Sequence, residues 1–195
     1  MNNVFFGGAF DPIHNAHLSM AKYIVEKGLA SKILFVPVYN PPHRKDHILS
    51  KYKDRLNMLE LALEGSPDFL VSDIESRIDT PSYTYRTLKH LQKELNTSIS
   101  LMIGEDQLSV FNTWFEYKKI IDQFQLIIFN RSKKVSEELM NLLKDKDVIW
   151  TDLKHKKISS TMIRQKIKEN KYEDIEDHLP EKVLKYIKEN GLYRS

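Results

Sequence analysis

The chain has 195 residues, a length that suits one compact domain spanning residues 1–195. Hydrophobic residues make up 41% and charged residues 29%, which is typical of a globular protein rather than a disordered or membrane chain. A net charge of +3 favours neither a histone-like nucleic-acid binder nor a membrane-surface protein. The lack of cysteine excludes disulfides, thiolate catalysis and cysteine-ligated zinc. No apolar run reaches the length of a signal-peptide core or a membrane span, so a cytoplasmic location is expected.

Short apolar runs alternate with helical patterns along the chain. The runs read as buried strands and lie at residues 4–6, 33–36, 69–71, 99–103, 126–129 and 148–150. Apolar residues on one helical face predict helices at 18–25, 52–63 and 84–95, with Gly28 ending the first. This alternation predicts an α/β fold with a doubly wound, mostly parallel sheet. Such sheets bind ligands beyond the carboxyl ends of their strands, so the loops there are the first candidates for a site.

The C-terminal part, residues 159–195, is predicted to be wholly helical and to serve mainly in packing. Pro180 can begin its last helix, and Gly191 follows the end of that helix. The helix has an apolar face expected to dock on the sheet layer, formed by Val183, Leu184 and Ile187. No repeat, low-complexity tract or Gly/Ser-rich linker marks a boundary, so a single domain is expected.

The loop after the first strand, from Gly7 to Leu18, carries the first candidate site. Gly7 and Gly8 let the backbone approach a ligand, and the N–H groups and dipole of the following helix favour phosphate there. The Gly-Lys-Ser or Gly-Lys-Thr ending of a Walker A motif is absent, so ordinary P-loop chemistry is not expected. His14 and His17 can turn both rings toward one anion. Histidines at a helix start also occur as surface or capping residues.

The combination of residues in this loop, Gly-Gly-Ala-Phe-Asp-Pro-Ile-His-Asn-Ala-His-Leu, resembles the signature of the HxGH nucleotidyltransferase superfamily. The resemblance implies a Rossmann-like fold and direct transfer of a nucleotidyl group from ATP. It implies that His14 and His17 are catalytic and stabilise the charge that develops as pyrophosphate leaves. Further ATP contacts are implied for Gly7, Gly8, Phe10 and Asp11. Two departures are Ala9, where Thr or Ser is common, and Ala16, where Gly is usual.

A second candidate segment, residues 158–164, has the sequence Ile-Ser-Ser-Thr-Met-Ile-Arg and opens another helix, with Ser159 or Ser160 suited to the N-cap. No acid occurs among residues 154–168, and the basic side chains there predict a positive patch: Lys154, Lys156, Lys157, Arg164, Lys166 and Lys168. Capping and solvation explain these residue types equally well. The segment resembles the ISSTxIR motif that partners the HxGH loop in adenylyltransferases, and it differs from the Lys-Met-Ser-Lys-Ser motif of class I aminoacyl-tRNA synthetases. ATP contacts are thereby implied for Ile158, Ser159, Ser160, Thr161 and Arg164.

Three middle segments bear on the acceptor of the transferred group. Residues 36–45 are too rich in proline for a helix and end in basic side chains that could clamp phosphate, His43, Arg44 and Lys45. Residues 75–84 lead from the third strand into a helix. Residues 104–106, Gly-Glu-Asp, follow the fourth strand, and Trp114-Phe115 form an aromatic pair in a loop, suited to stacking on a flat pyridine. Each segment also has an alternative role: a stiff loop for residues 36–45, a helix cap for residues 75–84, and core packing for Trp114.

The order and spacing of these segments resemble the nicotinate-nucleotide adenylyltransferases over nearly the whole chain. The resemblance implies adenylyl transfer from ATP to nicotinate mononucleotide, giving nicotinate adenine dinucleotide and pyrophosphate in NAD biosynthesis. It places Thr84, Trp114 and Phe115 at the nicotinate ring, Gly104 and Asp106 on the adenosine side, and Arg131 at the mononucleotide phosphate. In departures from the family, Arg86 stands where an acid is usual, Asp79 stands where Gly is common, and Arg131 lacks the Pro-Gly that often follows.

Catalysis of this kind needs positioning and charge stabilisation rather than a covalent nucleophile. Mg²⁺ is expected on the ATP phosphates, held by their oxygens and water, and no protein metal ligand is assigned. The expected partners are ATP and nicotinate mononucleotide, without nucleic acid or membrane, and a homo-oligomer is compatible with the sequence. Nicotinamide mononucleotide or phosphopantetheine as acceptor, or a non-catalytic nucleotide-binding regulator, are the open alternatives. A nucleic-acid-binding module would need a basic stripe interleaved with aromatics, which is not evident.

Overall fold

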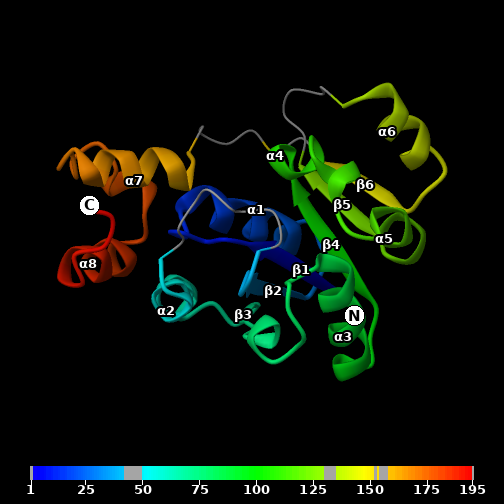
Figure 1. The fold of residues 1–195 in the computed structure, drawn as a ribbon, viewed down its shortest axis with the longest axis horizontal. Coiled ribbons are helices and arrows are strands. Elements are labelled where there is room, and N and C mark those ends of the chain that lie inside the picture. Colours follow the sequence, from blue (N-terminus) through cyan, green and yellow to red (C-terminus); the bar gives the residue numbers. More distant parts are fainter. Residues whose placement is uncertain (1, 42–49, 130–134, 152, 154–157, 195) are drawn as a thin grey trace.

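The computed structural model of the protein describes residues 2–41, 50–129, 135–151, 153 and 158–194. Its centre is a six-stranded sheet with the strand order β3-β2-β1-β4-β5-β6, and every neighbouring pair is parallel (Figure 1). The strands are β1 (Asn3–Gly8), β2 (Lys32–Pro37), β3 (Phe69–Val71), β4 (Ile99–Gly104), β5 (Leu126–Phe129) and β6 (Val148–Thr151). They coincide with the six apolar runs, so the doubly wound α/β prediction is confirmed.

Helices connect the strands. The α-helices are α1 (Asn15–Glu26), α2 (Tyr52–Leu63), α3 (Thr84–Leu95), α4 (Glu105–Leu108), α5 (Tyr117–Gln123), α6 (Glu137–Leu143), α7 (Ser160–Lys168) and α8 (Glu181–Glu189). Short 3-10 helices are η1 (Ile74–Ser76), η2 (Phe111–Thr113) and η3 (Glu176–His178). Gly28 ends the first predicted helix with a φ of +67°, a conformation that glycine adopts at little cost. None of the helices within the described ranges is long and apolar enough to cross a membrane.

The two faces of the sheet bury two separate hydrophobic cores because successive side chains of a strand point to opposite sides. Phe6 and Phe35 belong to a core with α1, α2, α7 and α8. Phe5 and Leu34, one residue away from them, belong to a core with α3, α5 and α6. The near-continuous apolar strands therefore follow from helices covering both faces.

The strand order reverses between β1 and β4. The connections through α1 and α2 lie on one face, and those through α3, α5 and α6 lie on the other. Ligands of open α/β sheets bind outside the carboxyl ends of the strands at such a switch point. Here these ends are Gly8 of β1 and Gly104 of β4, so the topology points to the loop of the histidine pair.

The C-terminal part contains α7, η3 and α8, joined by turns. Asn170 adopts a φ of +57° after α7, and the N–H of Lys171 returns to the carbonyl of Lys166 at 2.9 Å, which closes the helix. The chain then runs through η3 to Pro180, the N-cap of α8. The interruption turns α8 back toward α2 (Figure 1).

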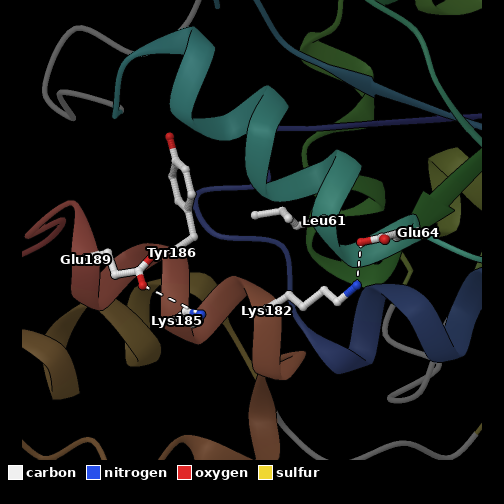
Figure 2. A pocket seen from close by; sticks show the side chains of 6 residues that line it. All are labelled: Leu61, Glu64, Lys182, Lys185, Tyr186 and Glu189. Atoms are coloured by element: carbon white, nitrogen blue, oxygen red, sulfur yellow. Dashed lines mark hydrogen bonds and ion pairs between the residues drawn. The ribbon is translucent and has the colours of Figure 1, made fainter.

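The apolar face of α8 is buried as expected, but the helix packs against α2, which itself covers the sheet. Polar contacts border this interface: Tyr186 donates its hydroxyl hydrogen to Asp54 at 2.9 Å, and Lys182 of α8 pairs with Glu64 of α2. Figure 2 shows the pocket between the two helices, where Lys185 and Glu189 form a second ion pair.

We expect Ile187→Ala to lower the free energy of unfolding by about 2–4 kcal/mol, because it leaves a cavity in the core shared by α8 and the sheet. Ile187 is 0% exposed. Urea unfolding should show one transition for the wild type and the variant if residues 1–195 form a single domain. Leu70→Ala, at a side chain 44% exposed, is the control and should cost less than about 1 kcal/mol. A separate transition for the C-terminal helices would contradict the single-domain prediction.

Candidate active site

The loop after β1 is built on aromatic packing. Phe10 is buried, adopts a φ of +47°, and lies under Gly8, where a Cβ would come within 3.1 Å of the Phe10 ring. A Cβ on Gly7 would lie 2.5 Å from the ring of Phe5. Both glycines are therefore needed for close aromatic contact, a reason that the sequence interpretation missed. Their expected role in approaching a ligand remains a prediction.

The two histidines stack on each other at the start of α1. Their ring centroids are 3.6 Å apart, with 18° between the planes, and His14 is the N-cap residue. The backbone N–H of His14 donates to Nδ1 of His17 at 3.3 Å, which places the proton of a neutral His17 ring on Nε2. The edges of Phe6 and Phe10 contact the His17 ring from other sides. His17 is thus held with an Nε2–H donor that the loop itself orients.

The second motif docks directly on the first. Ser160 donates its hydroxyl hydrogen to the carbonyl of Pro12 at 2.9 Å, across 148 positions of sequence. Arg164 donates to the carbonyl of Asp11 at 2.7 Å and to the hydroxyl of Thr161 at 3.3 Å. Ser159 is the N-cap and accepts from the backbone N–H of residue 162 at 3.2 Å. The structure therefore brings the two predicted half-sites together.

Both helix starts at this junction carry no acidic residue in the first turn. This holds for α1 and for α7, whose first-turn N–H groups carry the positive end of the helix dipole. Ser159 and Thr161 are exposed beside the docking contact, whereas the half-buried Ser160 and Arg164 make it. The junction is suited to a polyanion that spans two helix N-termini.

Two of the six basic residues of the predicted positive patch do not lie free beside the N-cap of α7. Lys166 pairs with Asp174, which lies beyond the window that was free of acids. Lys168 is exposed at the C-terminal end of α7, away from the N-cap. Lys154, Lys156 and Lys157 lie outside the described residues, so their part in the patch stays a prediction. Among the described residues, Arg164 and the helix ends supply the positive charge at the junction.

Asp11 faces the protein interior rather than the junction. Its side chain is 1% exposed, and its two carboxylate oxygens accept from the hydroxyl of Tyr193 at 2.7 Å and from the backbone N–H of Ser50 at 3.3 Å. Burial, and then the nearby Asp11 carboxylate, raise the pKa of Tyr193, so its hydroxyl stays a donor. Arg55, also buried, donates to the carbonyls of Ala9 at 3.0 Å and Ser50 at 3.2 Å. These contacts fix the loop from below, and the implied ATP contact of Asp11 stays a prediction.

The segments assigned to the acceptor are joined by a buried carboxylate, Glu75, which is 4% exposed. It accepts from the backbone N–H of Tyr39 at 3.0 Å and from the hydroxyl of Thr87 at 3.0 Å. Two more hydrogen bonds join Asn40 and Ser82. The backbone N–H of Asn40 donates to the hydroxyl of Ser82 at 3.0 Å, and the backbone N–H of Ser82 donates to the carbonyl of Asn40 at 2.9 Å. The loop after β2 is therefore held against the start of α3.

The aromatic segment after η2 meets the start of α3 through a stack of Tyr83 and Phe115, with ring centroids 4.5 Å apart. Tyr83 is the N-cap of α3, and Thr84 is its first residue. Trp114 packs edge-on against the buried Phe111, at 5.2 Å between centroids, and is half-buried. The side chains predicted at the nicotinate ring thus come from two elements that touch.

Several predicted site residues lie outside the described part of the chain. They are His43, Arg44, Lys45 and Arg131, and of Asp106 only the backbone is described. Gly104 is the last residue of β4, and α4 begins at the next residue. A Cβ on Gly104 would make an ordinary van der Waals contact with Met20 at 3.8 Å and would meet no other described residue within 4 Å. Among the described residues, nothing therefore crowds Gly104 at the switch point.

Sequence reasoning missed the buried residues that hydrogen-bond the loops of the site, which are Arg55, Glu75 and Tyr193. Arg55 could have been noticed as a charge on the buried face of the predicted helix 52–63. Glu75 and Tyr193 carry no such signal, because a carboxylate before a turn and an aromatic residue near a terminus usually lie at the surface.

Comparison with known proteins places the chain among nucleotidyltransferases. Residues 5–166 match the cytidylyltransferase-like family. A Clostridium botulinum (strain Okra / Type B1) protein named "Probable nicotinate-nucleotide adenylyltransferase" is 37% identical over 202 aligned residues, covering 100% of both chains. A Clostridium tetani protein of the same name is 37% identical and covers 97% of both. The Plasmodium falciparum nicotinic acid mononucleotide adenylyltransferase complexed with NaAD shares the fold, with a TM-score of 0.83, 24% identity, and coverage of 98% of this chain and 97% of that one.

We expect Tyr193→Phe to destabilise the protein by about 1–3 kcal/mol, because the buried Asp11 carboxylate loses a donor. Urea unfolding measures the change. Tyr172→Phe is the matched control, since the buried hydroxyl of Tyr172 has no hydrogen-bond partner among the described residues and its removal should cost nothing. Equal effects of the two substitutions would argue against a supporting role for the Tyr193 hydroxyl.

A second prediction concerns pH. Burial raises the pKa of Glu75, against the lowering effect of hydrogen bonds from Tyr39, Ser82 and Thr87. The folded state therefore holds this proton more tightly than the unfolded state, whose pKa is about 4.3. Below the pKa of the unfolded state, binding of this proton adds to the free energy of unfolding. The contribution is lost as pH rises through the pKa of the folded state.

The neutral variant Glu75→Gln should lack this component of the pH dependence. Its Oε1 can accept from Tyr39, and its amide can donate to Thr87, whose hydroxyl lies 3.3 Å from the carbonyl of Tyr83. In urea titrations between about pH 4.5 and 8, the wild type should lose stability relative to the variant as pH rises. A stability difference that is constant over this range would contradict the prediction.

Proposed function

The chain belongs to the nicotinate-nucleotide adenylyltransferases of the cytidylyltransferase-like family, and we propose that it transfers AMP from ATP to nicotinate mononucleotide. The products are nicotinate adenine dinucleotide and pyrophosphate, as in NAD biosynthesis. The observation that carries this proposal is the docking of Ser160 and Arg164 on the loop of His14 and His17. This docking brings the N-termini of α1 and α7 together near the switch point of the sheet.

We propose that the triphosphate of ATP lies at the junction of α1 and α7. The N–H groups at the two helix starts and the exposed hydroxyls of Ser159 and Thr161 would contact its oxygens. His17 would donate from Nε2 to the oxygens that gain charge, with the stacked His14 beside it. The adenosine would lie toward Gly104, which has no side chain at the end of β4.

In the proposed reaction an oxygen of the mononucleotide phosphate attacks the α-phosphorus of ATP. The new bond forms in line with the bond from the α-phosphorus to the bridging oxygen of pyrophosphate, which breaks and leaves its electron pair on pyrophosphate. No protein nucleophile takes part, so the contribution of the enzyme is orientation and charge stabilisation. The Thr84, Trp114 and Phe115 region would hold the nicotinate ring.

Mg²⁺ fits this arrangement as an ion carried by ATP. The described residues contain no group of three or more His, Asp or Glu side chains that could hold a metal, and the Asp11 carboxylate faces inward. Magnesium keeps several waters and binds readily to phosphate oxygens, so it needs no protein cage. When bound, it would neutralise charge on the triphosphate. The expected cytoplasmic location and a homo-oligomer stay predictions.

The proposal is tested by measuring pyrophosphate release with ATP, Mg²⁺ and separate acceptors. Nicotinate mononucleotide should give the highest kcat/KM, ahead of nicotinamide mononucleotide and phosphopantetheine. Preference for either of the other acceptors would keep adenylyl transfer but change the substrate. ATP binding without turnover of any acceptor would indicate a regulator instead.

We expect His17→Ala to lower kcat/KM by at least about 100-fold, since it removes a donor to the charge that develops on pyrophosphate. The circular dichroism spectrum should stay that of the wild type. His90→Ala, at an exposed histidine of α3, is the control and should keep normal turnover. Wild-type kinetics in His17→Ala would exclude the proposed role of the pair.

A further inference from the structure

Arg86 lies over the aromatic stack at the proposed acceptor site. Its guanidinium carbon is 5.1 Å from the ring centroid of Tyr83 and 5.2 Å from that of Phe115. These two rings stack at 4.5 Å, and the Arg86 side chain is half-buried. Attraction between a cation and the faces of aromatic rings fixes the position of the guanidinium without using its N–H groups.

The positive charge of Arg86 is not neutralised within the described part of the chain. No ion pair or hydrogen bond joins its side chain to any described residue, and the first turn of α3 contains no acid. Lys119 and Arg77, in contrast, each pair with a carboxylate. A guanidinium has five N–H donors in a planar fork that matches a carboxylate. Arg86 is therefore held in place with its donors available to a ligand.

The location of Arg86 connects it to the acceptor. It lies two residues after Thr84 in the first turn of α3, and Phe115 follows Trp114 directly. Thr84, Trp114 and Phe115 are the residues assigned to the pyridine ring. Nicotinate and nicotinamide mononucleotides differ at that ring only in an anionic carboxylate against a neutral carboxamide.

We propose that Arg86 is a specificity-determining residue that makes the site prefer an acceptor ring bearing a carboxylate; this inference rests on the proposed function. A guanidinium can form two parallel hydrogen bonds with a carboxylate of opposite charge, whereas a carboxamide offers one neutral acceptor oxygen. The amide also presents N–H groups that the guanidinium cannot accept.

The experiment compares kcat/KM for nicotinate and nicotinamide mononucleotides, at saturating ATP and Mg²⁺, in the wild type and Arg86→Gln. The ratio of the two values should fall about tenfold in the variant, through a higher KM for the nicotinate form. The value for nicotinamide mononucleotide should change less than about twofold. Arg86→Lys should keep part of the ratio, because it keeps the charge but loses the planar fork.

Lys89→Gln is the matched control, because it removes one positive charge from an exposed site on the same helix, where Lys89 hydrogen-bonds only Gln92. Its ratio should equal that of the wild type. Raising the salt concentration should lower the ratio in the wild type more than in Arg86→Gln, as expected for a partly exposed charge. Arg86→Met, which keeps the aliphatic stem over the rings, replaces Arg86→Gln if that variant fails to fold.

An unchanged ratio in both neutral variants would overturn the inference and leave adenylyl transfer intact. A parallel loss with both acceptors would also overturn it, since it would indicate a packing role for Arg86. Equal kcat/KM values for the two mononucleotides in the wild type would also overturn it, because there would be no selectivity for Arg86 to determine. No turnover of either acceptor by the wild type would reject the proposed function, and this inference with it.

Discussion

Two hydrogen bonds to the backbone carbonyls of Asp11 and Pro12 hold the two halves of the candidate site together. Their donors, Arg164 and Ser160, belong to α7, which follows β6, whereas the carbonyls follow β1. In the sheet, β4 and β5 separate these two strands, so strand pairing alone cannot bring the motifs into contact. Burial of Ile163 and Ile167 in the core with α1 and α2 returns α7 to the first loop. Hydrophobic docking of one helix is thus the condition for the phosphate junction.

The same loop is stabilised from its inner side so that its outer side can stay positive. The Asp11 carboxylate is satisfied by Tyr193 and Ser50, and Arg55 binds two loop carbonyls. Buried charges persist in proteins when they are paired or hydrogen-bonded in this way. The arrangement removes the one acid of the loop from the helix starts, where negative charge would compete with phosphate.

The acceptor side of the candidate site is also supported by a buried carboxylate that is held by hydrogen bonds. The buried carboxylate of Glu75 gathers donors from the loop after β2 and from α3, and those hydrogen bonds offset part of its desolvation. It joins the segments that a ligand would bridge. The cation of Arg86 is supported by aromatic rings instead of acids. The carboxylates of Asp11 and Glu75 thus lie in the supporting layer, whereas Arg86 lies at the proposed acceptor site.

The sequence by itself determined the six strands, the parallel layout and the two motifs, because these depend on local periodicity and on residue types at fixed spacing. It also indicated that ligands bind at the loops after the strands, but the strand order and its switch point came from the structure. Only the tertiary structure decided what supports the site. The contacts of Tyr193 with Asp11, and of Glu75 with Tyr39, join residues 182 and 36 positions apart, a distance at which local pattern carries no information. The residue at which α7 ends also came from the structure, because the left-handed turn at Asn170 has a weak sequence signal, whereas glycine at Gly28 has a strong one.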